Sequence, residues 1–223
     1  MLPLSASMDA LGAQSWTDLG VADVPVDRVV GTVSRADDFD RAMRPLRPHL
    51  RGRWESVAAE VEAGRGLPPV RLVLLGELYF VVDGHHRVSV ARANGQVTVE
   101  AQVRRLCTVA YACHCLTLLD LPNKAAERRF LERFPLPDDV RPWLWLDDPA
   151  DWSRIEDAAR RWLDEHRAAV DVDDTAGAED LLERWWRHEV LPTAHSCQGA
   201  DRVRLDDYLC ALRDRDTGGC CLM

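Results

Sequence analysis

The sequence predicts an α+β protein with a small α/β module over residues 20–106 and an all-α helical region over residues 107–216. Two observations support this division. Segments with the alternating apolar and polar pattern of strands occur only in the first half of the 223-residue chain. Beyond residue 106 the apolar residues recur every three or four positions, which is typical of amphipathic helices. We expect residues 1–19 to be a flexible lead-in and residues 217–223 a flexible tail.

The elements of the module follow from periodicity and from the residues that end each segment. A two-residue hairpin turn at Gly76-Glu77 separates two apolar runs. Gly95 suits the end of a helix, because glycine adopts the left-handed conformation found there. The expected strands are Val24–Val30, Val70–Leu75, Leu78–Val82 and Val97–Val103, and the expected helices are Trp54–Ala63 and His86–Asn94.

The second half has the pattern of four helices. Pro122 suits the first turn of a helix that continues to Phe134. A long helix begins near Asp151, and apolar positions at 181–186 and 205–212 mark two more. The tryptophans at 152, 162, 185 and 186 fall on apolar faces, so we expect them to pack in a core. The acidic segment Asp171–Gly177 is predicted to be a solvated linker.

Charge is unevenly distributed along the chain. The formal net charge is −9, but residues 20–106 contain 13 Arg against 11 Asp plus Glu, a net of +2. Residues 107–223 carry a net of −9. An acidic half repels the phosphate backbone to which nucleic-acid-binding proteins are attracted, so nucleic acid is an unfavoured partner.

The sequence also indicates where the protein is located. Residues 1–14 lack the charged and apolar regions of a secretory signal, and no apolar stretch reaches membrane-spanning length. We expect a cytoplasmic protein without membrane contact, whose seven cysteines are reduced thiols. Zinc binding by Cys107, Cys113, His114 and Cys115 is a minor alternative, because these residues lack a paired Cys-x-x-Cys arrangement.

The segment Asp83-Gly84-His85-His86-Arg87 is the main candidate for a functional site. It follows a strand and opens a helix, whose N-terminal N–H groups and dipole favour an anion. Arg87 is unusual in a first helical turn, because its charge opposes the dipole by roughly 0.3–1 kcal/mol. A bound phosphate reverses that penalty and accepts a charge-assisted bond. In the simpler alternative, Asp83 only caps the helix and the histidines are solvated.

The module resembles the ParB/sulfiredoxin-like fold over Val24–Val103, about 80 residues. The matching segments are Val24–Val29, Leu67-Pro68-Pro69-Val70, Tyr79–Arg87 and Gly95 before the last strand. The family includes ParB proteins that bind and hydrolyse CTP, sulfiredoxins that use ATP, and free-serine kinases. The resemblance implies that Gly84, His85, His86 and Arg87, with Ser89 on the next turn, hold the phosphates of ATP or CTP.

Differences from the family limit the range of reactions that the resemblance implies. Sulfiredoxins have a catalytic cysteine where this chain has His85, and ParB proteins have a more arginine-rich turn followed by a DNA-binding region. The form Asp-Gly-His-x-Arg looks most similar to the kinase-like members. The resemblance therefore implies a phosphotransferase or NTPase that acts on a small-molecule or protein acceptor. The alternative is a nucleotide-gated regulator or DNA-associated protein without turnover.

Roles within the predicted site follow from side-chain chemistry. His85, His86 and Asp83 are the candidate catalytic residues, and Asp83 and Asp38 are the candidate ligands of Mg²⁺. If His85 or His86 carries a proton, we expect its two negative neighbours, the bound phosphate and Asp83, to raise its pKa above about 6.5. The arginines between Arg41 and Arg53 form either a solvated loop or a second grip on the phosphates.

Overall fold

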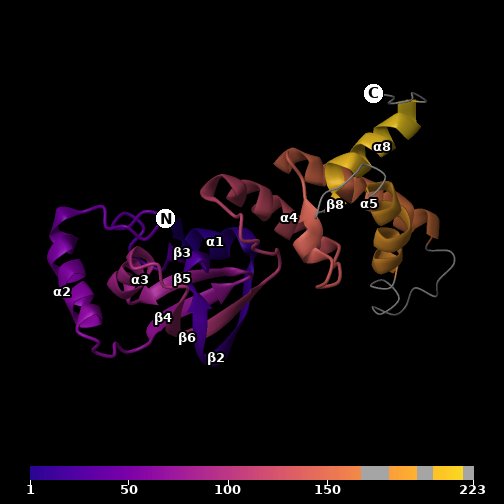
Figure 1. Cartoon of the computed structure of the whole chain (residues 1–223). Helices are drawn as coiled ribbons and strands as arrows, with labels where there is room; N and C mark the ends of the chain where they lie inside the picture. Colours follow the sequence, from indigo (N-terminus) through magenta and orange to yellow (C-terminus); the bar gives the residue numbers. More distant parts are fainter. Residues whose placement is uncertain (167–180, 195–202, 218–223) are drawn as a thin grey trace. The chain divides into compact units, whose positions relative to one another are not determined.

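The structure is a computed structural model that describes residues 1–166, 181–194 and 203–217. The chain divides into two compact units, Met1–Leu121 and Pro122–Met223, and each is described by itself (Figure 1). The predicted acidic linker Asp171–Gly177 and residues 218–223 of the predicted tail lie outside the described residues.

The first unit is built on a six-stranded mixed sheet with the order β1-β3-β5-β4-β6-β2. The pairs β1–β3, β3–β5 and β4–β6 are parallel, whereas β4–β5 and β2–β6 are antiparallel. The predicted hairpin at Gly76-Glu77 joins β4 to β5, and Gly76 has a φ of 58°. The strands are β1 (Leu2–Pro3), β2 (Ala13–Pro25), β3 (Val29–Thr32), β4 (Val70–Leu75), β5 (Leu78–Asp83) and β6 (Thr98–Thr108).

Three helices complete this unit: α1 (Leu4–Leu11), α2 (Arg51–Glu62) and α3 (His85–Ala93). Figure 1 shows α3 between α2 and the sheet. Val88 and Ala91 of α3 join one buried apolar cluster with residues of β4, β5 and β6. The indole Nε1 of Trp54 on α2 donates to Ser89 Oγ on α3 at 2.9 Å, and this bond connects the two helices. Three-residue 3-10 turns occur at Val26–Arg28, Pro48–Leu50 and Leu118–Asp120.

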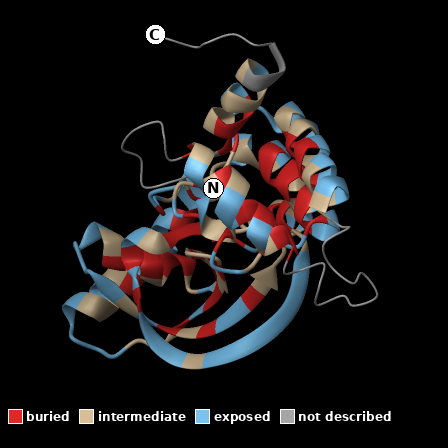
Figure 2. Cartoon of the chain, turned by 90° about the vertical axis from the view of Figure 1, so that its right-hand side faces the viewer, coloured by how far each residue is buried: buried red, intermediate tan, exposed pale blue. Residues whose placement is uncertain are grey.

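The N-terminal residues differ from the flexible lead-in that we expected for residues 1–19. Leu2 and Pro3 pair with β3, and α1 buries Leu4 and Leu11. The rest of the segment lies in β2, which forms a long ladder with β6 although most of its residues are exposed (Figure 2, pale blue). Main-chain hydrogen bonding therefore orders a segment that we expected to be flexible.

Two boundaries of the module also differ from expectation. The predicted strand Val24–Val30 is interrupted, because Val26–Arg28 form a 3-10 turn between β2 and β3. Val24 and Val26 are both buried, so the alternating pattern continues through the bend. The first unit extends to Leu121 rather than to residue 106, since the segment after β6 packs on the β4–β5 turn, where Glu77 N donates to Ala112 O at 3.0 Å.

The cysteines correct another expectation. Cys113 and Cys115 form a disulfide, so these two residues are not the reduced thiols that we predicted. Cys107 and Cys210 are unpaired. Within the described ranges, no group of three or more His, Cys, Asp or Glu side chains could hold a metal ion, so the zinc alternative has no ligand set there.

The second unit is mostly helical, as predicted, with a short two-stranded sheet in addition. Trp152, Trp185 and Trp186 are buried as expected, and Phe130 packs between Trp152 and Trp185. Among the described residues, no helix has the length and apolar character needed to cross a membrane. The elements are α4 (Leu121–Arg133), β7 (Leu144–Trp145), α5 (Trp152–His166), a π-helix (Trp186–Val190), α7 (Leu191–Ala194), β8 (Val203–Arg204) and α8 (Leu205–Thr217), with 3-10 turns at Arg141–Trp143 and Pro149–Asp151.

Gly31 tests the packing at the centre of β3. A Cβ atom there would collide with the ring of Phe80 and lie 2.8 Å from Leu2 O. We expect Gly31→Ala to lower the free energy of unfolding by about 1–3 kcal/mol, as overpacking usually does. Gly52→Ala on α2 is the control, because a Cβ at Gly52 meets nothing within 4 Å. Urea unfolding of both variants measures the difference, and equal stabilities would contradict the packing.

Candidate functional site

The candidate site lies where β3 and β5 end. The two strands are parallel neighbours, with Thr32 opposite Val81, so the chain leaves both at the same edge of the sheet. Arg35 follows β3, and the segment Asp83–Arg87 follows β5. Parallel pairing thus brings together residues that are about fifty positions apart in the sequence.

Gly84 makes the turn between β5 and α3 possible. Its φ is 97°, a conformation that L side chains rarely adopt, and a Cβ there would lie 2.6 Å from Val70 Cγ1. No side chain caps the helix, so Asp83 is not the simple cap of the alternative reading. The first helical bond is donated by Val88 to Gly84 O. The N–H groups of the three preceding residues are therefore available to an anion.

Arg87 has a different environment from the one that we expected for a phosphate ligand. Its guanidinium donates to Asp83 Oδ2 at 2.7 Å, to Pro69 O at 3.0 Å and to Pro68 O. The side chain is only 16% exposed. Arg87 therefore joins the end of β5 to the segment before β4, and internal acceptors already satisfy much of its hydrogen-bonding capacity.

His85 is a buried, neutral histidine. Its Nε2 lies 2.6 Å from Thr32 Oγ1 at the end of β3, and its ring stacks on Phe39 with the centroids 5.5 Å apart. Burial, aided by the charges of Arg35 and His86, lowers the pKa of His85 to about 4. Asp83 alone does not raise the pKa as we expected, because desolvation outweighs its opposing effect.

His86 lines the cavity and has one buried ring nitrogen without a hydrogen-bond partner in the described part of the chain. The residue is 9% exposed, and its ring meets Phe39 edge to face at 5.3 Å. Its Nδ1 is buried and has no hydrogen-bond partner among the described residues. Burial and the charges of Arg35 and Arg53 lower the pKa of His86, again opposite to our expectation.

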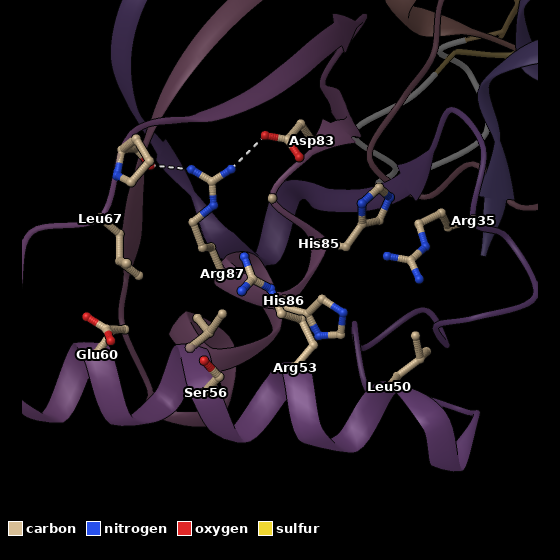
Figure 3. Close-up of a pocket in the computed structure, with 13 residues that line it drawn as sticks. Arg35, Leu50, Arg53, Ser56, Glu60, Leu67, Asp83, His85, His86 and Arg87 are labelled. Carbon is tan, nitrogen blue, oxygen red and sulfur yellow. Dashed lines mark hydrogen bonds and ion pairs between the residues drawn. The ribbon is translucent and has the colours of Figure 1, made fainter.

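Two arginines outside the motif complete the site. Figure 3 shows Arg53 rising from α2 toward the turn, and Arg35 extending beside His85. Arg35 Nε donates to Asp38 at 2.8 Å, and its guanidinium lies over the Phe39 ring. Arg53 belongs to the arginine-rich segment Arg41–Arg53. For this segment the sequence left two alternatives, a solvated loop or a second contact with the phosphates. Arg35 was not predicted from the sequence.

These residues surround a cavity of about 500 Å³ between α2 and the turn. The predicted residues Asp83, Gly84, His85, His86 and Arg87 all line it. Two other predicted residues do not: Ser89 is buried and binds Trp54, and Asp38 pairs with Arg35. The remaining lining residues are Arg35, Leu50, Arg53, Ser56, Val57, Glu60, Leu67 and Pro68.

The lowered pKa of His85 predicts how stability depends on pH. Between about pH 6.5 and pH 4 the unfolded chain takes up a proton at His85 that the folded chain does not. The contribution is therefore complete above pH 6.5 and is lost as the pH falls toward 4, at a cost on the order of 2–3 kcal/mol. Urea unfolding at pH 7.0 and 4.5 should show a smaller difference for His85→Gln than for the parent. An NMR titration midpoint near 6.5 for this ring would contradict the assignment.

Comparison with known proteins returns the fold that the sequence resembles. No protein-family model matches the chain, and no curated protein matches its sequence. Sulfiredoxin from Arabidopsis thaliana matches with 13% identity over 38% of this chain and 84% of its own, with a TM-score of 0.30. A second match is the C-terminally truncated chromosome-partitioning protein ParB from Caulobacter crescentus, complexed with CTP-γ-S. It has 18% identity over 74% of this chain and 99% of its own, with a TM-score of 0.30. A Pnob8-like ParB-N domain matches with 14% identity over 92% of this chain and 84% of its own, with a TM-score of 0.28. Sulfiredoxin and ParB are the proteins whose fold the sequence resembles, and at such identities the likeness concerns the fold alone.

Proposed function

We propose that the first unit binds a nucleoside triphosphate, ATP or CTP, with its phosphates at the start of α3. The observation that carries this proposal is the uncapped helix N-terminus beside Arg53 in one cavity. Arg53 forms no ion pair with any residue that the structure describes. A phosphate there would accept main-chain N–H bonds and a charge-assisted bond from the guanidinium.

The charges around the cavity support an anionic ligand. Arg87 is paired with Asp83, Arg35 with Asp38, and Glu60 with Arg65. Arg53 has no ion-pair partner in the part of the chain that the structure describes, so its positive charge is uncompensated there. The field of Arg35 and Arg53 also lowers the pKa of His86. A potential that disfavours an imidazolium cation favours a phosphate by the same Coulomb interaction.

The remainder of the cavity suits the nucleoside. Leu50, Val57, Leu67 and Pro68 supply apolar contacts, while Ser56 and Glu60 supply polar groups. The volume of about 500 Å³ lies within the usual range of small-molecule sites, roughly 300–1,000 Å³. The lining therefore offers apolar contacts for a base and positive charge for phosphates.

Magnesium is expected to accompany the triphosphate, because it neutralises phosphate charge during phosphoryl transfer. Asp83 is the carboxylate we propose as its protein ligand, since it lines the cavity and its side chain is 64% exposed. One carboxylate is sufficient for such a site, because Mg²⁺ usually keeps several waters and phosphate oxygens as ligands. Asp38 is a weaker candidate, because it does not line the cavity.

Phosphoryl transfer or nucleotide hydrolysis is a second candidate function, and His86 is the observation that favours it. His86 lines the cavity, and its buried Nδ1 has no partner among the described residues, which suits a ring that accepts or passes a proton. His85 is better suited to positioning, because Thr32 and Phe39 hold its ring. A nucleotide-gated regulator without turnover uses the same phosphate contacts and needs no free histidine nitrogen.

The phosphate contact of Arg53 can be tested against a matched arginine. We expect Arg53→Ala to weaken the binding of ATP, CTP or inorganic tripolyphosphate about 10- to 100-fold, because a hydrogen bond to a charged group contributes roughly 1.5–3 kcal/mol. Isothermal titration measures the change. Arg51→Ala removes the same charge from α2, but Arg51 pairs with Glu55 and does not line the cavity, so binding should be retained. Equal affinities of the two variants would refute the proposed site.

His86→Gln separates the enzyme from the regulator. If His86 carries a proton during turnover, release of phosphate or labelling of an acceptor should fall at least tenfold in this variant, while nucleotide affinity changes little. Both quantities should be measured with Mg²⁺ between pH 5 and pH 9. A parent protein that binds the nucleotide but releases no phosphate and labels no acceptor is the regulator.

A further inference from the structure

A second cluster of reactive residues lies at the other end of β5, away from the phosphate site. The turn Gly76-Glu77 begins β5, whereas the proposed phosphate site follows its last residue, Asp83. Packed on this turn is the segment Tyr111–Cys115, which contains the sequence Cys113-His114-Cys115. The proposed nucleotide site uses none of these residues.

We propose that Cys113 and Cys115 form a redox-active pair that exchanges two electrons with a low-molecular-mass thiol. Only one residue separates the two cysteines, their Cα atoms are 5.4 Å apart, and their Sγ atoms are bonded. Cys113 is 6% exposed, whereas Cys115 is partly exposed, so a thiol can reach the pair on the Cys115 side. The intervening His114 has a side chain that is 61% exposed.

Hydrogen bonds hold this segment in place independently of the disulfide. The Glu77 carboxylate accepts from His114 N at 2.9 Å and from Tyr111 Oη at 3.2 Å, and it lies 3.1 Å from His114 Nδ1. These bonds keep the pKa of Glu77 low although burial acts to raise it, so the carboxylate stays charged. Glu77 N donates to Ala112 O, and Leu116 N donates to Cys113 O at 3.1 Å. Because the backbone is fixed on both sides, the two thiols remain neighbours after reduction.

The size of the disulfide loop argues against a role as a structural cross-link. The entropy that a disulfide removes from the unfolded chain grows with the number of residues it encloses. Cys113 and Cys115 are only two positions apart, so the gain is close to the minimum. A pair that contributes little to stability, is held by other bonds and is reachable at one sulfur suits reversible exchange.

The exchange takes place in two steps. A thiolate RS⁻ attacks Sγ of Cys115, the Cys113–Cys115 bond breaks, and its electron pair leaves on Cys113 Sγ, which takes a proton from water. A second thiolate then attacks the external sulfur of the mixed disulfide, forms RSSR and releases Cys115 as a thiolate, which also takes a proton from water. In total, two RSH reduce one disulfide to two thiols and become RSSR, and the reverse sequence restores the pair.

The experiment uses a variant that keeps only Cys113 and Cys115, with Cys107, Cys197, Cys210, Cys220 and Cys221 changed to serine. It is equilibrated with glutathione buffers from fully reduced to fully oxidised, quenched by alkylation, and analysed by mass spectrometry. We expect the intramolecular disulfide to appear and disappear reversibly across the series. The melting temperatures of the two forms should differ by less than about 5 °C, because the small loop adds little stability. If the variant does not fold, the oxidation state of the peptide that contains Cys113 and Cys115 is measured by the same method in the unmodified chain.

The control keeps Cys107 and Cys210 instead, two cysteines that the structure leaves unpaired. It should form mixed disulfides with glutathione and no intramolecular bond. Three results overturn the proposal: thiols at 113 and 115 that stay alkylatable in the most oxidising buffer, a bond that persists in excess thiol, or unfolding on reduction. None of these results affects the nucleotide proposal, because the phosphate ligands contain no sulfur.

Discussion

The close contact between Gly84 and Val70 is the constraint on which the candidate site depends. A Cβ atom at residue 84 would lie 2.6 Å from Val70 Cγ1. The φ of 97° at this position is also one that residues other than glycine rarely adopt. Because the chain can turn there, α3 begins directly after β5, with its first N–H groups uncapped. The same turn lets Arg87 reach back to Asp83, so the strand end and the helix start are joined as one rigid corner.

Local features of the site could be predicted from the sequence, whereas its long-range members could not. The strand, the glycine and the helix around Asp83–Arg87 follow from residues that are adjacent in the chain, and all five motif residues line the cavity. Arg35 joins them only because β3 and β5 are parallel neighbours, and no periodicity shows that pairing. Ser89 was expected among the phosphate ligands, but on α3 it points to Trp54, an orientation set by the packing of α2.

The expected role of Arg87 and the expected pKa of the histidines both failed for one physical reason. Burial and internal hydrogen-bond acceptors affect these side chains more than their neighbours in the sequence do. From the sequence, Arg87 appeared as an unpaired charge in need of a phosphate, but the carbonyls of Pro68 and Pro69 supply acceptors from another segment. The pKa values of the histidines were expected to be raised by a bound phosphate and by Asp83. In the folded chain they are buried beside Phe39 and Arg35, and desolvation dominates their pKa. Both effects come from tertiary contacts, so residue order alone could not reveal them.

The electrostatics of the corner link protonation to anion binding. Arg35 and Arg53 lower the pKa of His86, and Arg35 lowers that of His85, because a cation beside an imidazole disfavours a second positive charge. A bound phosphate offsets that field, so it raises both pKa values. By linkage, each proton gained must strengthen phosphate binding by the same factor. Acid therefore has two opposed consequences at this corner, because it weakens the empty fold through the buried histidines and strengthens the hold on the ligand. The fold thus holds both histidines in the neutral form, and an anion bound at the proposed site would shift them toward the charged form.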